Sequence, residues 1–290
     1  MAGPSRYVNS VTERLNNIFE PRLEYDFFYF IWDDDLGNKK RRDEEKYYND
    51  IIKSNKTKCF ILNKSYTAEE IQKLTKFEQD NSHSTINAMI GMFTSMNILC
   101  HHLMLLPDSL EYTHILRIRT DCLILDNNFL HDSLFKKNNV LVSKNYVIPD
   151  SWISDHIMFA KKDLFLKFWK HKNVYEIIDL YKKGEMNPER TLSYIAKINY
   201  LDVQAIFTRY VDYHIVYNPA KENEPESLKA YLNKNDNLRE LFINHNKYLV
   251  KDEFTAMSNS LKQNISNLNE AFRKKSLLER IKNKVKRFLK

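Results

Sequence analysis

The chain has 290 residues, enough for a core that needs no disulfide or metal ion to stabilise it. Hydrophobic residues make up 43% of it and aromatic residues 13%, which excludes a disordered protein because so much apolar surface offsets the entropy lost on folding. Only four glycines occur, too far apart for G-x-G-x-x-G or G-x-x-x-x-G-K-[ST]. Dinucleotide-binding Rossmann proteins and P-loop ATPases are therefore poor candidates.

The net charge of +7 is concentrated at the carboxyl end of the chain. Residues 271–290 contain nine lysines or arginines and one glutamate, a balance of +8, so the other 270 residues carry a net charge of −1. A nearly neutral body offers no basic stripe for a phosphate backbone. We therefore expect no nucleic-acid partner.

The three cysteines, Cys59, Cys100 and Cys122, are odd in number, widely spaced and set among apolar residues. This usage is typical of buried thiols in a reducing cytoplasm. The amino-terminal residues lack the apolar core of a secretory signal, and the longest apolar stretch, residues 89–106, is interrupted by polar side chains and predicts a buried helix. We expect a cytoplasmic protein, either soluble or attached to the inner face of the inner membrane.

Short aromatic and β-branched runs alternate with helical patterns along the chain, which predicts an α/β protein. The first strand is expected at residues 26–32, before three aspartates, and the second at 57–62. A helix should begin at Ser65 or Thr67 and reach about residue 80, and a long central helix should span 84–105. The next strand is expected at 114–120.

The second half of the body continues the alternation, up to a polar, proline-containing segment at residues 219–226. This segment divides an α/β domain, residues 1–218, from a carboxyl-terminal helical region, residues 219–290. Strands are expected at residues 140–143, 146–148, 156–160 and 213–217. Helices are expected at residues 163–171, 174–183, 188–198 and 202–210.

Polar residues that follow strands are the first candidates for a site, because open α/β sheets bind ligands at the carboxyl ends of their strands. Asp33 follows the strand at residues 26–32, and Arg117, Arg119 and Asp121 lie at the end of the strand at 114–120. Alternation along a strand places the latter three on one side, where their charges would be costly in a plain core. The arginines could bind a ligand, or they could pair with Asp121 or with the acids at 33–35.

A third polar cluster precedes the strand at residues 156–160. Trp152, Asp155 and His156 suit a sugar, because carboxylates accept hydrogen bonds from hydroxyl groups and indole faces stack on pyranose rings. The alternative is that Ser154 or Asp155 caps a turn.

The loop after the first acids contains Asn38, Lys39 and further cations, which could reach phosphates or form a solvated charged loop. Near the carboxyl terminus, residues 276–290 predict an amphipathic helix with a basic polar face. We expect this helix to bind an anionic membrane surface. It could instead dock on the body or on another subunit.

Several segments in order carry a family likeness: residues 2–7 (AGPSRY), 26–41 (DFFYFIWDDDLGNKKR), the helix with Asn87 and Met96, 114–121 (HILRIRTD) and 154–164 (SDHIMFAKKDL). Together they resemble bacterial WavE-type lipopolysaccharide synthesis proteins and related capsule glycosyltransferases. The resemblance covers roughly residues 2–220. It implies a GT-A-like sheet flanked by helices that binds a nucleotide-sugar donor.

The resemblance also implies roles for single residues. It likens Asp121 to the acid of the metal or nucleotide-sugar motif, and Asp155 to an acid near the acceptor that serves as general base. Arg119 stands where a full Asp-x-Asp motif has an acid, so Mg²⁺ or Mn²⁺ would have few ligands, and Arg119 could neutralise the diphosphate instead. The loop near the donor diphosphate would comprise Gly3, Ser5 and Arg6.

The sequence thus leads us to expect a glycosyltransferase that moves a sugar from a nucleotide donor to a lipopolysaccharide or capsule glycan of the cell envelope. Asp121 and Asp155 would be its catalytic residues, and Arg117 and Arg119 would bind the donor. Two alternatives remain: a sugar-phosphate transferase, and a non-enzymatic module that binds a membrane or nucleic acid.

Overall fold

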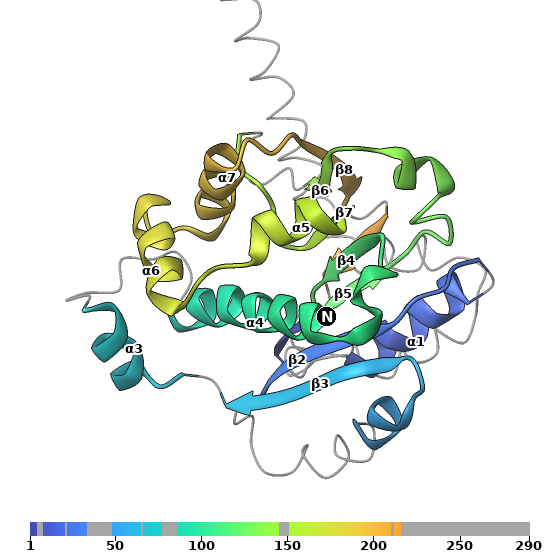
Figure 1. Ribbon diagram of the computed structural model, residues 1–290, viewed down its shortest axis with the longest axis horizontal. Helices are drawn as coiled ribbons and strands as arrows, with labels where there is room; N and C mark the ends of the chain where they lie inside the picture. Colours follow the sequence, from blue (N-terminus) through green and yellow to red (C-terminus); the bar gives the residue numbers. More distant parts are fainter. Residues whose placement is uncertain are drawn as a thin grey trace, which may run out of the picture.

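The computed structural model describes residues 1–4, 8–20, 22–33, 48–64, 66–76, 86–144, 151–209 and 212–215. This part of the chain is a mixed α/β protein, as predicted (Figure 1). The region from residue 219 onward, with the helix expected at 276–290, lies outside the described residues. The strand expected at 146–148 also lies outside them.

The main strands form two sheets that meet at β1. Parallel pairing gives the order β1-β2-β3 in the first sheet, and the second has the order β4-β7-β6-β8. A parallel bridge between Ala2 of β1 and Arg119, just after β4, joins them. Reading across gives β3-β2-β1-β4-β7-β6-β8, with β7 antiparallel to its two neighbours. The strand bounds are β1 Ala2–Pro4, β2 Phe27–Asp33, β3 Thr57–Lys64, β4 His114–Ile118, β6 Val140–Lys144, β7 Ile157–Lys161 and β8 Val203–Thr208.

The strand β2 shows why both faces of the sheet are covered. Its residues read as a nearly continuous apolar run, the pattern of a parallel strand buried on both faces. Tyr29 and Ile31 belong to the apolar cluster that includes α1 (Val8–Phe19), whereas Phe30 and Trp32 belong to the cluster of α4 (Ile86–Leu105). Successive residues point to opposite faces, so β2 separates two helical layers.

The helix α4 is the central helix that the sequence predicted. In the part of the chain that the structure describes, it is the one helix long and apolar enough to cross a membrane, and most of it is buried. It packs on β1 and β2 and on α5 and α6. A Cβ at Gly91 would lie 3.3 Å from the Trp32 indole, so this close helix–strand contact needs a small residue.

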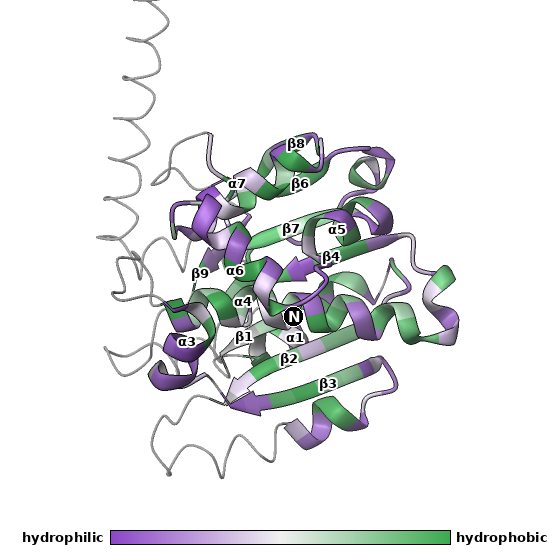
Figure 2. Cartoon of the chain, turned by 60° about the vertical axis from the view of Figure 1, so that its left-hand side comes forward, coloured by the Kyte–Doolittle hydropathy of each residue, from purple (hydrophilic) through white to green (hydrophobic). Residues whose placement is uncertain are grey.

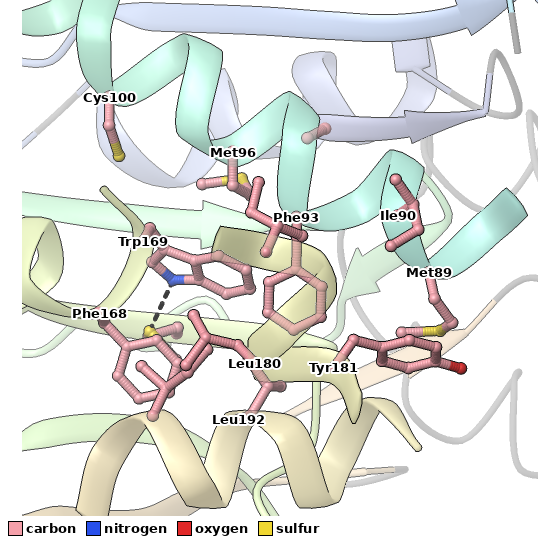
Figure 3. Packing of buried hydrophobic residues seen from close by; sticks show 14 of the residues in the cluster. Met89, Ile90, Phe93, Met96, Cys100, Phe168, Trp169, Leu180, Tyr181 and Leu192 are labelled. Carbon is pink, nitrogen blue, oxygen red and sulfur yellow. Dashed lines mark hydrogen bonds between the residues drawn. The ribbon is translucent and has the colours of Figure 1, made fainter. Parts of the chain in front are cut away.

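Three helices complete the layer over α4: α5 (Lys162–Trp169), α6 (Val174–Lys183) and α7 (Pro188–Ile198). The side chains of Asn173 and Asn187 cap the amino ends of α6 and α7 by accepting from backbone N–H groups. Figure 3 shows Phe93 and Met96 of α4 pointing into the same core as Trp169, whose Nε1–H donates to the Met158 sulfur at 3.0 Å.

Several boundaries agree with the sequence and others do not. The helix α3 (Ala68–Thr75) begins at a Thr67 capping box, as predicted, but ends about five residues early, where Lys76 has a positive φ of 53°. The helix α1 was not predicted. Short 3₁₀ turns occur at η1 (Pro107–Leu110) and η2 (Asp132–Lys136), and an unpredicted strand β5 (Cys122–Ile124) pairs antiparallel with β9 (Tyr213–Ile215).

The helix predicted at residues 202–210 is wrong, because this segment forms β8. The segment contains β-branched and aromatic residues, VQAIFT, and pairs in parallel with β6 from Val140 to Lys144. A short mixed sequence of this kind fits either period, and pairing with a distant strand decides between them.

Candidate functional site

The candidate site lies where the carboxyl end of β4 meets the beginning of β7. The two strands are antiparallel and Ile118 pairs with Ile157, so the residues after β4 lie beside those before β7. The backbone N–H of Arg119 donates to the carbonyl oxygen of His156 at 3.3 Å. Because Ala2 forms a bridge with Arg119, β1 also reaches this edge.

This edge is also where the order of the strands reverses. The chain steps outward from β1 to β2 and β3, and then returns to place β4 on the other side of β1. The crevice outside the carboxyl ends of strands at such a reversal is where open α/β sheets bind ligands. The carboxyl ends of β1 and β4 therefore border the expected binding position.

Arg119 is the centre of a charged cluster at this edge. Its Nε and Nη2 donate to the two carboxylate oxygens of Asp121 at 2.9 and 2.8 Å, a bidentate pair, and its Nη1 lies 3.3 Å from Asp155 Oδ2. The side chain of Arg119 is 29% exposed, whereas those of Asp121 and Asp155 are 4% and 15% exposed. Arg119 is thus the member of the cluster that water or a ligand reaches most easily.

Arg117 supports the cluster from inside. It is buried, donates through Nη1 to the backbone carbonyl of Asp155, and its guanidinium lies 4.9 Å from the centre of the Trp169 ring. Burial lowers the pKa of Arg117 to about 10, although the Asp155 charge opposes this, so it stays charged at neutral pH. Its Nε has no hydrogen-bond partner among the residues that the structure describes.

Both carboxylates are ionised at neutral pH. Burial by itself raises the pKa of Asp155, but the charges of Arg119, His156 and Arg117 outweigh burial and lower it to about 2. Burial also acts to raise the pKa of Asp121, and the pairing with Arg119 overcomes it and lowers that pKa. The two arginines and two aspartates therefore compensate each other's charge.

His156 connects this cluster to β9. Its Nδ1 lies 2.8 Å from the Tyr213 hydroxyl, and its Nε2 lies 3.8 Å from Asp155 Oδ1. Burial lowers the pKa of His156 to about 3, because the favourable charge of Asp155 does not offset the loss of solvent and the repulsion from Arg119. His156 is therefore neutral at physiological pH.

Two residues of the cluster were missed in the sequence. Tyr213 reads as an apolar strand residue, and no local signal places it beside His156, which is 57 positions away. Arg209 follows β8 and forms a bridge with Tyr213, and its charge contributes to the low pKa of His156. Because residues 202–210 were predicted as a helix, Arg209 was not considered. A strand ending at residue 208 would have identified it as a polar residue that follows a strand.

The other site residues predicted from the sequence are distributed differently. The Trp152 ring is covered at 4.9 Å by the guanidinium of Arg190, and Trp152 is half-buried. Gly3 was expected in a loop but lies within β1, opposite Ile31. Asp33 ends β2, and its side chain is not among those described. Four further donor-binding candidates lie outside the described residues: Ser5, Arg6, Asn38 and Lys39.

The residues at Asp121 do not fit a divalent cation as they are arranged. Both oxygens of Asp121 accept hydrogen bonds from Arg119, whose guanidinium occupies the direction from which an ion would approach. Over the described ranges, no group of three or more His, Cys, Asp or Glu side chains could hold a metal ion. The compensating cation at this position is the arginine itself.

Chemically, the cluster offers a reachable guanidinium between two ionised carboxylates and a neutral imidazole. Such a set can bind an anion through the arginine and accept a proton through a carboxylate.

Comparison with protein-family models and with curated proteins finds no match to this chain.

Proposed function

We propose that this chain is a glycosyltransferase with a GT-A-like body, which transfers a sugar from a nucleotide-sugar donor to a hydroxyl group of a cell-surface glycan. The observation that carries the proposal is the position of Arg119, between Asp121 and Asp155 at the reversal of strand order. The strand order, with one antiparallel strand between β4 and β6, is compatible with such a fold.

The donor would bind through Arg119. A guanidinium can donate to a phosphate through its N–H groups, and the Arg119 side chain is 29% exposed, so a phosphate can reach it. Gly3 lies in β1, Asp33 ends β2 and Arg117 lies near the end of β4. We include them in the proposed donor site, together with Ser5, Arg6, Asn38 and Lys39. The arginines would then stabilise the diphosphate as it leaves, without a step through a metal ion.

Asp155 would act as the base, and donor binding would prepare it for this role. In the free protein its pKa is about 2, chiefly because the charge of Arg119 outweighs burial, and a carboxylate of that pKa is a weak base. When Arg119 shares its charge with a diphosphate, the pKa of Asp155 rises toward a useful value. Basicity would thus appear only when the donor is in place.

The transfer itself balances as a single displacement. The acceptor oxygen forms a bond to the anomeric carbon, its proton passes to Asp155, and the bond between that carbon and the diphosphate oxygen breaks with its electron pair. Trp152 and His156 are proposed to position the acceptor sugar, with Arg190 over the Trp152 ring. Residues 271–290 are proposed to hold the enzyme on an anionic membrane.

A donor screen tests the proposal. The full-length protein is heated with individual nucleotide sugars, with the corresponding nucleotides and with free sugars; a donor at 100 times its Kd adds about 2.7 kcal/mol to the free energy of unfolding. Turnover is then followed by release of nucleotide in the presence of glycan acceptors. The same measurements are made on Asp155→Asn and, as a matched control, on Asp179→Asn, an exposed residue of α6.

The products separate the competing functions. Release of nucleoside diphosphate, lost in Asp155→Asn and kept in Asp179→Asn, supports glycosyl transfer. When the donor sugar is linked through a diphosphate, release of nucleoside monophosphate identifies a sugar-phosphate transferase instead. Absence of stabilisation by every nucleotide and nucleotide sugar contradicts the proposal and favours a non-enzymatic binding module.

A further inference from the structure

Tyr213 places a buried hydroxyl group behind the charged cluster. It lies in β9, is fully buried, and pairs with Ile124 of β5. Figure 2 colours most of β7 as hydrophobic and the carboxyl end of β4 as hydrophilic, so the polar side chains gather at one end of this strand pair. The Tyr213 hydroxyl reaches this end, where it lies 2.8 Å from Nδ1 of His156. A buried hydroxyl group so placed can determine how the imidazole is held.

The hydrogen bond between these two side chains has one donor, and the protonation of both rings identifies it. Burial raises the pKa of Tyr213 well above its ordinary 10, so the hydroxyl keeps its proton. His156 is neutral, so one ring nitrogen carries a hydrogen atom and the other carries a lone pair. Its Nε2 lies 3.8 Å from Oδ1 of the Asp155 carboxylate, where an N–H group is favoured over a lone pair. The hydrogen atom therefore belongs on Nε2, and Nδ1 accepts from the Tyr213 hydroxyl.

The two oxygens of the Asp155 carboxylate have different neighbours. Oδ2 lies 3.3 Å from Nη1 of Arg119, whereas Oδ1 lies nearest to Nε2 of His156. The separation of 3.8 Å at Oδ1 is too long for a hydrogen bond, but a charge and an N–H dipole still attract each other in a buried site. Binding of a diphosphate by Arg119 would weaken the contact at Oδ2 and leave the one at Oδ1 in place. After donor binding, the orientation of the carboxylate thus depends on His156.

The backbone around Asp155 is held by other contacts, so it does not depend on the Tyr213 hydroxyl. The Ser143 hydroxyl of β6 bonds to the Ser154 hydroxyl at 2.9 Å and accepts from the N–H of Ile157 at 3.2 Å. Ser143 also bonds to the Tyr213 hydroxyl, and it keeps its other two contacts when that hydroxyl is removed. Loss of the hydroxyl should therefore release the imidazole and leave the strands in place.

We propose that Tyr213 is a positioning residue for the transfer reaction. By donating to Nδ1, it holds His156 with Nε2–H toward Asp155, and this contact keeps the carboxylate oriented while Oδ2 accepts the proton of the acceptor hydroxyl. Tyr213 is fully buried and acts only through His156. The catalytic part of this role rests on the proposed function of Asp155, but the state of the imidazole can be measured without any substrate.

Tyr181 provides a matched control for substitution by phenylalanine. It is also fully buried, and its hydroxyl donates to the carbonyl oxygen of Met186 at 2.6 Å. It belongs to α6 and to the apolar cluster of α4, and not to the charged cluster. Tyr213→Phe and Tyr181→Phe each remove one hydrogen-bonded buried hydroxyl and keep the ring, so each should lower the melting temperature by a similar amount.

The first measurement is the state of the His156 imidazole in the full-length protein without ligand. Histidine is labelled with ¹⁵N, and the His156 resonances are assigned by their loss in His156→Gln. The parent and Tyr181→Phe should both carry the hydrogen on Nε2. In Tyr213→Phe this hydrogen should exchange with solvent at least about tenfold faster, because the imidazole is no longer held.

The second measurement is turnover with the nucleotide sugar selected by the donor screen. In Tyr213→Phe, kcat should fall about 10- to 100-fold while the KM for the donor changes less than about twofold, because Arg119 is intact and only the base is misplaced. Tyr181→Phe should keep both constants within about twofold of the parent. A tyrosine that only fills the core would give no such difference between the two variants.

Three outcomes overturn the proposal. In the first, the parent carries the hydrogen on Nδ1, so that Tyr213 accepts instead of donating. In the second, the Nε2 hydrogen exchanges equally fast in Tyr213→Phe and in the parent. In the third, kcat falls no more in Tyr213→Phe than in Tyr181→Phe. If no nucleotide sugar binds, the proposed function fails and the catalytic role of Tyr213 with it, whereas the first measurement still decides whether Tyr213 holds His156.

Discussion

The aromatic core beneath α4 and the charged cluster at the end of β4 are both largely buried, but different interactions hold them together. In the core, Phe93 and Trp169 pack with ring centres 5.6 Å apart, and the contacts are non-directional (Figure 3). In the cluster, Arg119 depends on the positions and charges of Asp121 and Asp155. The comparison shows that burial alone does not say how a region responds to mutation or to pH.

The consequence is a division of roles. Packed apolar groups contribute stability in proportion to the area removed from water, and protons do not affect them. Compensated buried charges contribute little net stability, yet removing one partner is costly because the other charge stays buried. We therefore expect core substitutions to change stability without changing its pH dependence, and cluster substitutions to change pH dependence and ligand binding.

Phe93→Ala should have the largest effect of these changes, and it tests whether the apolar core contributes stability independently of pH. Loss of a fully buried ring should lower the free energy of unfolding by about 3 to 5 kcal/mol, because a cavity forms between α4 and α5. Denaturant unfolding at pH 7 and pH 5 measures it, and the loss should be equal at both. Leu105→Ala, at a position that is 80% exposed on the same helix, is the control and should change stability by less than about 0.5 kcal/mol. A loss of unfolding free energy in Phe93→Ala that differs between pH 7 and pH 5 would contradict the expectation that core substitutions leave the pH dependence of stability unchanged.

Acid should destabilise the folded protein through its buried titratable groups. The folded protein holds the pKa of His156 near 3, below its ordinary 6.5, so the unfolded chain binds more protons and stability falls as pH falls below 6.5. At up to about 1.4 kcal/mol per pH unit, the loss reaches roughly 3 kcal/mol by pH 4, and buried His214 adds a similar loss. Asp155 extends the decline from pH 4 toward pH 2.

His156→Gln checks this pH dependence. Urea unfolding between pH 7 and pH 4 should have a shallower slope in His156→Gln than in the parent. The exposed His131→Gln should keep the slope of the parent. An unchanged slope in His156→Gln would mean that folding does not lower the pKa of His156.

Asp121→Asn should lower the free energy of unfolding by about 2 to 3 kcal/mol, less than a fully buried pair would lose, because Arg119 is partly exposed. The bidentate partner of Arg119 becomes neutral, and the remaining charge of Arg119 is left with Asp155 alone. Calorimetry of unfolding measures the change, with Asp179→Asn as the control. A loss below about 0.5 kcal/mol would show that the pair is not formed in solution.

Arg119→Lys should have the smallest effect of these changes, and it tests whether Arg119 binds a phosphate ligand. Lysine keeps the charge but loses the planar fork, so affinity for a nucleoside diphosphate should fall about tenfold, or roughly 1.4 kcal/mol. Isothermal titration measures it, and Arg22→Lys, at an exposed arginine, should bind like the parent. If Arg119→Lys binds the nucleoside diphosphate as tightly as the parent, Arg119 stabilises the fold and does not bind the ligand.

The sequence predicted much of the fold where local patterns are strong. The buried run at β2 and the long apolar pattern of α4 are clear signals, and the Thr67 capping box marks the start of α3. The failures occurred where the pattern was short or mixed. The segment VQAIFT became β8 because it pairs with β6, a partner some sixty residues earlier in the chain.

The candidate site was predicted in part. Arg119, Asp121, Asp155 and His156 were identified because polar residues that border apolar strands are visible in the sequence, and the antiparallel pairing of β4 with β7 brings them together. The pairing of Arg119 with Asp121 had been an open alternative and is the observed geometry. Tyr213 could not be found, since a hydroxyl on an apolar strand gives no signal until its neighbour is known.

The sequence by itself determined the α/β class, the central helix and the residues of opposite charge that end the strands, because apolar periodicity and local caps are short-range properties. Only the tertiary structure decided which charges compensate each other. Asp121 lies only two residues from Arg119 in the chain, whereas Asp155 reaches the same guanidinium because of the register of β4 against β7. The low pKa of Asp155 follows from that choice, since ionisation in a buried site depends on distances across strands that no local pattern encodes.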